Sequence, residues 1–413
     1  MSDKKLYGPF TQLITMHALP LHGSLKDEEL PVTEYGGVLV ENGYVTAIGN
    51  FDTLKDENPD SKMLLEGKGP LTAIPGLVDC HTHICWAGER SKDYAMRVEG
   101  KTYLEIAKSG GGIADTVEAT RNASDEELLT GLLERADRLL KIGITVAEVK
   151  SGYGLNKEDE LRILRVINKA NEQTPLELVP TFLGAHIKPK DFIGPHEDYL
   201  KILIEEVMPV IKKEELCERA DIFVEEGAFD IKMADKYIRS LQDLDMQVTV
   251  HADQFHPGGA KLAIRNKCVS ADHLENTDAE TIEAFANRET VAVALPGASL
   301  GLGMQQAPCR KLLDNDACLA IASDWNPGSA PMGDLLTQAS ILGASEKLSI
   351  SETLAGVTCR AAFALRMDAG VIHVGSRARI AVFPTDDVRN IFYHQGQLKP
   401  IYTIIENDCI SHG

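Results

Sequence analysis

Short apolar runs alternate with amphipathic segments through the middle of the chain. Apolar residues recur at helical spacing in "DEELLTGLLERADRLLKIG" (125–143) and "KEDELRILRVINKANEQ" (157–173), and both segments are predicted helices. Continuous apolar runs of strand length lie before and after them. This alternation is typical of βα units arranged around a parallel sheet. The pattern therefore predicts an α/β protein.

Eight of the apolar runs are predicted strands, and seven of them end in a polar or ionisable group. In chain order they are "TAIPGLVDCHTH", "TVAEVKSGYG", "LELVPTFLGAH", "DIFVEEGAF", "QVTVHADQ", "CVSADHLE", "TVAVALPGAS" and "CLAIASDWNPG". A (β/α)₈ barrel builds its site at the carboxyl ends of its strands, so count and polarity together predict a TIM-type barrel over residues 74–363. An open doubly wound sheet is the alternative, but no GxGxxG turn follows any strand.

The two ends of the chain have a different pattern. "GGVLVENGYVTAIGN" (36–50) contains two alternating segments around an Asn-Gly turn, which predicts a β-hairpin. Residues 369–410 again show short β-branched runs separated by Gly, Pro and Asp. We predict that residues 1–73 and 364–413 form one small composite β-sandwich domain beside the barrel.

Composition narrows the possible partners. The chain has 413 residues, of which 44% are hydrophobic and 25% charged, as in a soluble globular protein. A formal charge of −20 would repel nucleic acid and anionic lipid, so we expect neither as a partner. Eight cysteines without a CxxC pair predict reduced thiols, and no apolar run reaches the length of a membrane helix. We therefore expect a cytoplasmic protein that acts on a small molecule.

Histidines gather at the predicted carboxyl ends of the strands. Five of the twelve lie there: His81, His83, His186, His251 and His273. His81 and His83, at a spacing of two, point the same way from an extended chain and can bind one metal ion. The other seven are predicted to lie in loops or in the small domain, and they are His17, His22, His196, His256, His373, His394 and His412.

Imidazole and carboxylate ligands together suit a borderline cation such as Zn²⁺ or iron. His81, His83, His251 and Asp324 form such a set at the ends of the first, fifth and eighth predicted strands. A bound metal ion lowers the pKa of its water from about 15.7 toward roughly 7 and so supplies a nucleophile at neutral pH. The set predicts a metal-dependent hydrolase.

Several sequence strings carry a family resemblance. "PGLVDCHTH", the later His251 and His273, and "SDWNPG" resemble the amidohydrolase superfamily of metal-dependent barrels. Within it, "DCHTHICWAGER", "EVKSGYGL", "TFLGAHIKP", "HADQ", "SADHLE" and "SDWNPGSAP", in this order, resemble the imidazolonepropionase family of histidine degradation. The resemblance spans nearly the whole chain. It implies hydrolysis of the ring amide of 4-imidazolone-5-propanoate to N-formimino-L-glutamate, one zinc or iron ion per chain, and a homodimer.

The resemblance also implies residue roles. Asp324 would be both a metal ligand and the base, while His273 would bond the water or the developing oxyanion and His186 would polarise the carbonyl. Arg90 offers a planar donor fork for the substrate carboxylate. The remaining substrate or product contacts would be Tyr153, His186, Asn326, Gly328 and Ser329. Two-metal relatives bridge their ions with a carboxylated lysine. Here Lys150 lies on the second strand and the fourth ends in Glu225 and Glu226, so we predict one metal ion rather than two.

Gln254 separates this reading from a rival one. Deaminases of the same superfamily, which act on nucleobase-like rings, place a glutamate three residues after the histidine of the fifth strand. A glutamine does not titrate and cannot be a general acid, so Gln254 is predicted to bond the substrate ring. Asp253 is expected to be structural, and the run Gly110–Gly112 to be a flexible loop or an anion contact. A second alternative, an inactive scaffold, is disfavoured because all four candidate ligands are present.

Overall fold

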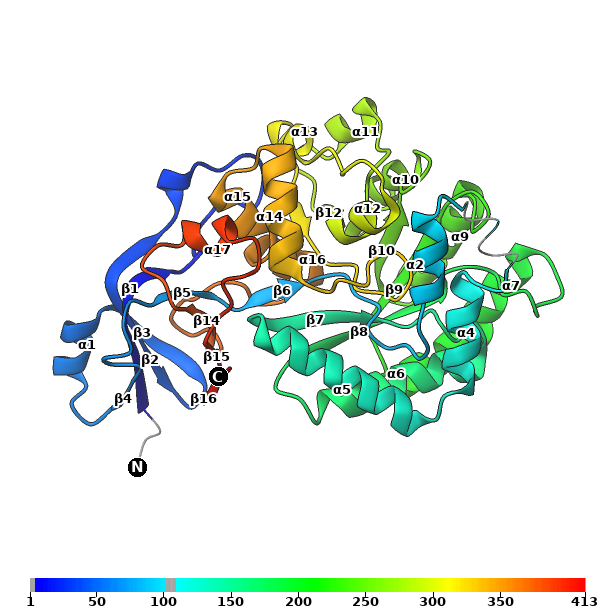
Figure 1. Ribbon diagram of the computed structural model, residues 1–413. Helices are drawn as coiled ribbons and strands as arrows, with labels where there is room; N and C mark the ends of the chain where they lie inside the picture. The colour runs from blue at the N-terminus through cyan, green and yellow to red at the C-terminus, as the bar shows by residue number, and fades with distance from the viewer. Residues whose placement is uncertain (1–3, 102–104, 106–108, 413) are drawn as a thin grey trace.

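Two eight-stranded sheets organise the chain (Figure 1). The computed structural model describes residues 4–101, 105 and 109–412. One sheet contains only the parallel strands from the middle of the chain, and the other is mixed and combines strands from both ends. Both chain ends lie on the side of the mixed sheet in Figure 1. The predicted α/β class and the composite sheet are both confirmed.

The parallel sheet is the predicted barrel. Each strand pairs in parallel with the next one along the chain. The strands are β6 (Leu77–Asp79), β7 (Ile144–Lys150), β8 (Glu177–Ala185), β9 (Arg219–Val224), β10 (Gln247–Ala252), β11 (Ser270–His273), β12 (Val291–Ala294) and β13 (Leu319–Ile321). Six of the eight lie within the predicted runs, and β7 and β9 begin one and two residues before theirs.

The barrel closes between its first and last strands, just beyond their carboxyl ends. The backbone N–H of His83 donates to the carbonyl of Trp325 over 3.0 Å, and the N–H of Asp324 donates to the carbonyl of His81 over 3.0 Å. A parallel bridge joins Thr82 to Trp325 at the same level. The segments that follow β6 and β13 are therefore held side by side.

Helices cover the outside of the barrel. α5 begins with a capping box, in which the Ser124 hydroxyl accepts from the N–H of Glu127 and the Glu127 carboxylate accepts from the N–H of Ser124. The helices of the barrel are α2 (Ser91–Val98), α4 (Ile113–Asn122), α5 (Asp125–Lys141), α6 (Lys157–Asn171), α7 (His196–Ile202), α8 (Met208–Glu214), α9 (Ile231–Gln242), α10 (Gly259–Arg265), α11 (Ala279–Ala284), α12 (Pro296–Leu302), α13 (Cys309–Asp314), α14 (Leu335–Glu346), α15 (Ile350–Gly356) and α16 (Cys359–Leu365). The two helices predicted from periodicity are α5 and α6.

The mixed sheet joins both chain ends by hydrogen bonds. Its order is β16-β15-β14-β5-β1-β2-β3, with β4 paired to β1. Its strands and helices are β1 (Lys4–Ile14), β2 (Val32–Glu41), β3 (Tyr44–Asn50), α1 (Phe51–Glu57), β4 (Lys62–Leu64), β5 (Thr72–Pro75), β14 (Arg379–Phe383), α17 (Arg389–Tyr393), β15 (Tyr402–Ile405) and β16 (Asp408–Ser411). β2 and β3 form the predicted hairpin around Asn42 and Gly43.

The first predicted strand run is divided between the two sheets at Gly76. β5 belongs to the mixed sheet, and β6 begins the barrel one residue after Gly76. A Cβ atom at position 76 would lie 2.3 Å from the Thr145 hydroxyl, so only glycine fits where the chain crosses β7. Barrel strands occupy residues 77–321 and the mixed sheet residues 4–75 and 379–411, whereas the exact domain limits stay a prediction.

Candidate active site

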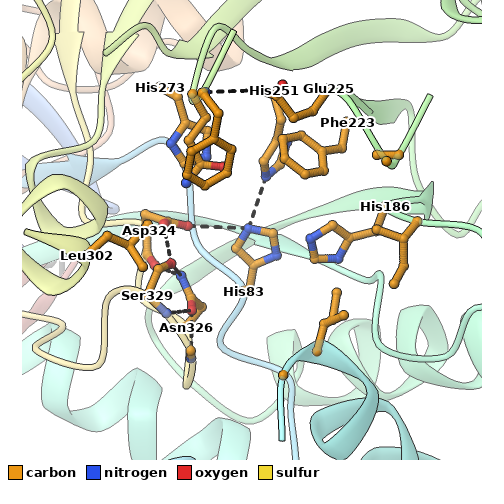
Figure 2. A pocket seen from close by; sticks show the side chains of 18 of the residues that line it. His83, His186, Phe223, Glu225, His251, His273, Leu302, Asp324, Asn326 and Ser329 are labelled. Carbon is orange, nitrogen blue, oxygen red and sulfur yellow. Dashed lines mark hydrogen bonds and ion pairs between the residues drawn. The ribbon is translucent and has the colours of Figure 1, made fainter. Parts of the chain in front are cut away.

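A cavity of about 740 Å³ opens at the carboxyl ends of the barrel strands (Figure 2). The strand ends and the loops after them supply most of its lining. Among the lining residues are His83, Arg90, Tyr153, His186, His251, Gln254, His273, Asp324, Asn326, Gly328 and Ser329. These eleven residues were all predicted to belong to the site. Arg90 lies just before α2, and the other ten lie at the ends of six barrel strands or in the loops that follow them.

Four ligand atoms converge at the bottom of this cavity. His83 Nε2 lies 3.3 Å from His251 Nε2 and 3.4 Å from Asp324 Oδ1. His81 Nε2 lies 3.5 Å from the same Asp324 oxygen. The three histidines are buried and their nitrogens lie within 4.8 Å of one another. Figure 2 shows His83 between His251 and Asp324.

Buried carboxylates orient two of the histidines. His81 Nδ1 donates to Asp272 Oδ2 over 2.6 Å, and His251 Nδ1 lies 2.9 Å from Asp221 Oδ2. Because a carboxylate only accepts, each contact places the proton on Nδ1 and the lone pair on Nε2. Both lone pairs therefore face the point where the four ligand atoms converge.

Lys150 lies directly behind these carboxylates. Its ammonium is 2.7 Å from Glu148 Oε2, 2.8 Å from Asp221 Oδ2 and 3.9 Å from Asp272 Oδ2. All four side chains are fully buried. Arg219 Nε lies 3.4 Å from the other Glu148 oxygen, on the side away from the histidines.

Burial controls the charge of these groups. Burial and the neighbouring cations hold the pKa of His81 and of His83 well below the usual value, and burial lowers the pKa of His251 to about 3. Burial alone would lower the pKa of Lys150, but the surrounding carboxylates outweigh it and raise that pKa. The histidines are thus neutral, as metal ligands must be, and the lysine is charged.

The loop after β13 positions Asp324. The residue has a left-handed backbone with φ of 52°, and burial raises the pKa of its carboxyl to about 6. The Ser329 hydroxyl donates to Asp324 Oδ2 over 3.3 Å. The Asn326 amide donates to the Asp324 carbonyl and accepts from the N–H groups of Gly328 and Ser329. The side chain of Asn326 is thereby engaged in folding the loop.

His186 and Tyr153 lie against the candidate metal ligand His83. The His186 ring stacks on that of His83 at 5.5 Å, and Tyr153 lies 5.9 Å from His186. His186 Nδ1 is 3.0 Å from the carbonyl of Gly152. A carbonyl only accepts, so Nδ1 carries the proton, and burial lowers the pKa of His186 to about 4. Nε2 is then an acceptor, which does not suit the predicted polarisation of a carbonyl oxygen.

His273 is directed by a carboxylate of its own. Its Nδ1 lies 3.6 Å from Glu275 Oε1, and that oxygen accepts from the Ser299 hydroxyl over 2.9 Å. Burial alone would lower the pKa of His273, but Glu275 and then Asp324 outweigh it and raise that pKa. His273 is therefore suited to donate a hydrogen bond within the cavity.

Arg90 is fixed by Asp93. Its Nε donates to Asp93 Oδ2 over 2.5 Å, and one terminal nitrogen donates to the Thr116 hydroxyl over 3.1 Å. Asp93 also accepts from the N–H of Gly112 over 2.9 Å, and a Cβ at Gly111 would lie 2.2 Å from its carboxylate. Gly111 and Gly112 thus pack on the residue that holds Arg90.

The polar residues after β10 lie in different surroundings. Gln254 lines the cavity, whereas Asp253 accepts from the N–H groups of Gly258 and Ala260 and from Thr277. His256 lies in the loop, with Nδ1 2.6 Å from Glu225. Asp253 therefore folds the loop that carries Gln254.

Sequence reasoning missed the carboxylates that hold the functional side chains. They are Asp93, Glu148, Asp221, Asp272 and Glu275. A signal existed for some of them, because residues two apart on a strand share a face. Glu148 and Lys150 form such a charged pair inside an otherwise apolar strand. Asp93 gave no such signal, since its helix has no buried apolar stripe.

Comparison with known proteins agrees with this architecture. The sequence profile of the amidohydrolase family matches residues 72–409. The chain belongs to the amidohydrolase family. Two curated relatives are both named imidazolonepropionase. That of Rubrobacter xylanophilus is 40% identical and covers 89% of each chain, and that of Alkaliphilus oremlandii is 36% identical and covers 94% of this chain and 93% of its own.

Within the amidohydrolases, the chain is thus a member of the imidazolonepropionases and a metal-dependent hydrolase, and the resemblance seen in the sequence is confirmed. Among solved structures, an adenosine deaminase from Xanthomonas campestris with bound zinc has a TM-score of 0.69 and 17% identity. It covers 98% of this chain and 92% of its own, and at this identity it shows the shared fold.

Proposed function

We propose that this amidohydrolase opens the ring amide of 4-imidazolone-5-propanoate to give N-formimino-L-glutamate, using one zinc or iron ion. The observation that carries the proposal is the convergence of His81, His83, His251 and Asp324 at the bottom of a cavity that Arg90 also lines. The names of the curated relatives support the choice of substrate.

The residues present fit a metal ion. Ligand atoms about 2.0–2.2 Å from a tetrahedral ion lie about 3.3–3.5 Å apart. The measured separations are 3.3 Å for His83–His251, 3.4 Å for His83–Asp324 and 3.5 Å for His81–Asp324. His81 Nε2 is buried and makes no hydrogen bond within the described residues. When bound, the ion lowers the pKa of a coordinated water and polarises a carbonyl oxygen.

Lys150 supports the prediction of a single ion. In two-metal relatives a carboxylated lysine bridges the two ions. Such a lysine must react with CO₂, but the ammonium of Lys150 is already paired with Glu148 and Asp221. With its proton donors directed at carboxylates, Lys150 offers no ligand to a second ion.

Asp324 is the proposed proton acceptor for the attacking water. Its Oδ1 faces His81 and His83, while its Oδ2 is held by the Ser329 hydroxyl. Held in this way, the carboxylate can take a proton from the nucleophile and pass it to the leaving ring nitrogen. His273, directed by Glu275, would donate to the oxyanion that develops on the ring carbonyl.

The other lining residues would orient the substrate. Nε2 of His186 accepts, so we assign it to a ring N–H rather than to the carbonyl oxygen. Tyr153 and Gln254 would contact the ring, and Arg90 would bind the propanoate carboxylate. Asn326 and Gly328 would act through the shape of the loop that carries Ser329 and Asp324.

The decisive experiment adds freshly generated 4-imidazolone-5-propanoate to the zinc-loaded protein. We expect the ultraviolet absorbance of the substrate to fall and N-formimino-L-glutamate to accumulate. Asp324→Asn is the matched control for contaminating activity. If the loaded protein did not accelerate the absorbance loss above this control, the substrate assignment would be wrong.

The expected location and partners of the enzyme rest on its sequence. Within the described part of the chain, no helix combines the length and the apolar character needed to cross a membrane. The cytoplasmic location, the homodimer and the lack of nucleic-acid or membrane partners stay predictions. The eight cysteines are free, as their spacing indicates.

A further inference from the structure

Lys150 is a buried cation behind the metal site, and the proposed function gives it no part in binding or catalysis. Lys150 is at the carboxyl end of β7, and its side chain is fully buried. Burying an isolated ammonium costs several kcal/mol, so a lysine is kept there only where carboxylates compensate. Here the compensating groups include the carboxylates that orient the histidines.

The contacts form two chains that start at the same ammonium. One runs from Lys150 Nζ over 2.8 Å to Asp221 Oδ2, and the same oxygen lies 2.9 Å from His251 Nδ1. The other runs over 3.9 Å to Asp272 Oδ2, which accepts from His81 Nδ1 over 2.6 Å. A single oxygen of each aspartate thus faces both the lysine and a histidine.

We infer that Lys150 is a positioning residue for the metal-binding histidines, because it holds Asp221 and Asp272 where they fix the Nδ1–H tautomers of His251 and His81. This inference rests on the metal site of the proposed function. It assigns Lys150 no contact with substrate or metal.

Three further contacts hold the lysine and its carboxylate partners in place. Glu148 Oε2 lies 2.7 Å from Nζ, and Glu148 Oε1 accepts from Thr181 over 2.6 Å. Thr249 donates to Asp272 Oδ2 over 3.0 Å. With Lys150 removed, Asp221 and Asp272 would be two buried carboxylates without their shared cation, and one would move or bind a proton. Either change would misdirect a histidine.

The test measures zinc binding, not turnover. We expect Lys150→Met, which keeps the length of the side chain, to weaken the zinc dissociation constant about 10- to 100-fold, in competition with a chromogenic chelator. Arg379→Met is the matched control, because it also removes a buried cation and its ion pair, with Glu177, at the opposite end of the barrel. The control should bind zinc as tightly as the unmodified protein.

A mutant cycle tests whether the lysine acts through the aspartates. Asp221→Asn and Asp272→Asn should each weaken zinc binding. Adding Lys150→Met to the double Asn variant should change the constant by less than about threefold, because the groups it positions are already altered. The Asn variants preserve side-chain volume, so their zinc affinities can still contradict the inference if Lys150→Met does not fold.

The outcomes separate the two proposals. Failure of the unmodified protein to bind zinc would overturn the metal site of the proposed function. Zinc binding by the unmodified protein, with Lys150→Met folded and equally tight, would overturn the role of Lys150 alone. Tight binding by both single Asn variants, or a full additive loss in the triple variant, would also contradict it.

Discussion

The two ends of the cavity hold their functional side chains in the same way but on different kinds of structure. At the proposed metal end, Asp221 on β9 directs His251 on the neighbouring β10, and Asp272 on β11 directs His81, which follows β6. At the arginine end, Asp93 directs Arg90 from the first turn of α2, outside the barrel. The groups proposed to act on the reacting bond thus lie on barrel strands or on the segments directly after them, whereas the group proposed to recognise the distant carboxylate lies at the start of a helix.

This difference predicts different kinetic consequences. Strands joined by hydrogen bonds on both sides hold a ligand set rigidly, which turnover requires. A helix start can vary without disturbing the barrel. Changes at the metal end should therefore lower kcat, whereas changes at the arginine end should mainly raise KM.

The largest effect should follow removal of the metal ion. A strong chelator followed by gel filtration should reduce hydrolysis to the uncatalysed rate, because no residue in the cavity replaces the activation of water. Adding back one equivalent of zinc per chain should restore the rate. Full activity in protein shown to be free of metal by elemental analysis would contradict the division of the cavity into a metal end and an arginine end.

Asp324→Asn should have the next largest effect. The amide keeps an oxygen toward the histidines but cannot accept the proton, so kcat should fall about 10²- to 10⁴-fold. Zinc per chain, measured in parallel, should remain near one. A variant with bound zinc and a nearly unchanged kcat would remove Asp324 from proton transfer.

Asp93→Asn tests the arginine end. The hydrogen bond to Arg90 Nε loses its charge, so KM should rise about 10-fold while kcat changes little. Thr116→Val is the matched control, since it removes the neutral contact of the same arginine and should raise KM only about threefold. A loss confined to kcat would show that the two ends are not functionally distinct.

Gln254→Ala should have the smallest effect. The side chain is proposed to bond the substrate ring without transferring a proton, so KM should rise about threefold with kcat within about twofold. Steady-state kinetics on the same substrate measure both. A fall in kcat as deep as that of Asp324→Asn would move proton transfer to β10.

The metal end of the cavity was easier to predict from the sequence than the arginine end. The eight barrel strands were evident as apolar runs separated by helical segments. The five histidines were evident because they follow such runs, at the carboxyl ends where a parallel barrel builds its site. The roles of Arg90 and Tyr153 came only from the family resemblance, since an arginine or tyrosine in a loop has no characteristic period.

The supporting carboxylates were harder to predict. Asp221 and Asp272 lie inside apolar runs, and the local sequence gives no indication of which histidine each meets across the sheet. Asp221 on β9 meets His251 on the adjacent β10, whereas Asp272 on β11 meets His81, which follows β6, so only the folded barrel brings each pair together. The tautomer of His186 likewise depends on a carbonyl 34 residues away in the chain.

Closure of the barrel has a consequence for how the enzyme matures. His81 and Asp324 are separated by most of the barrel sequence, yet their backbones are hydrogen-bonded where the first and last strands meet. During synthesis, His81 and His83 can therefore meet Asp324 only after the eighth strand has left the ribosome. Under the proposed function, the nascent chain gains its four metal ligands only when the barrel is closed, so binding of the ion would mark the end of barrel folding.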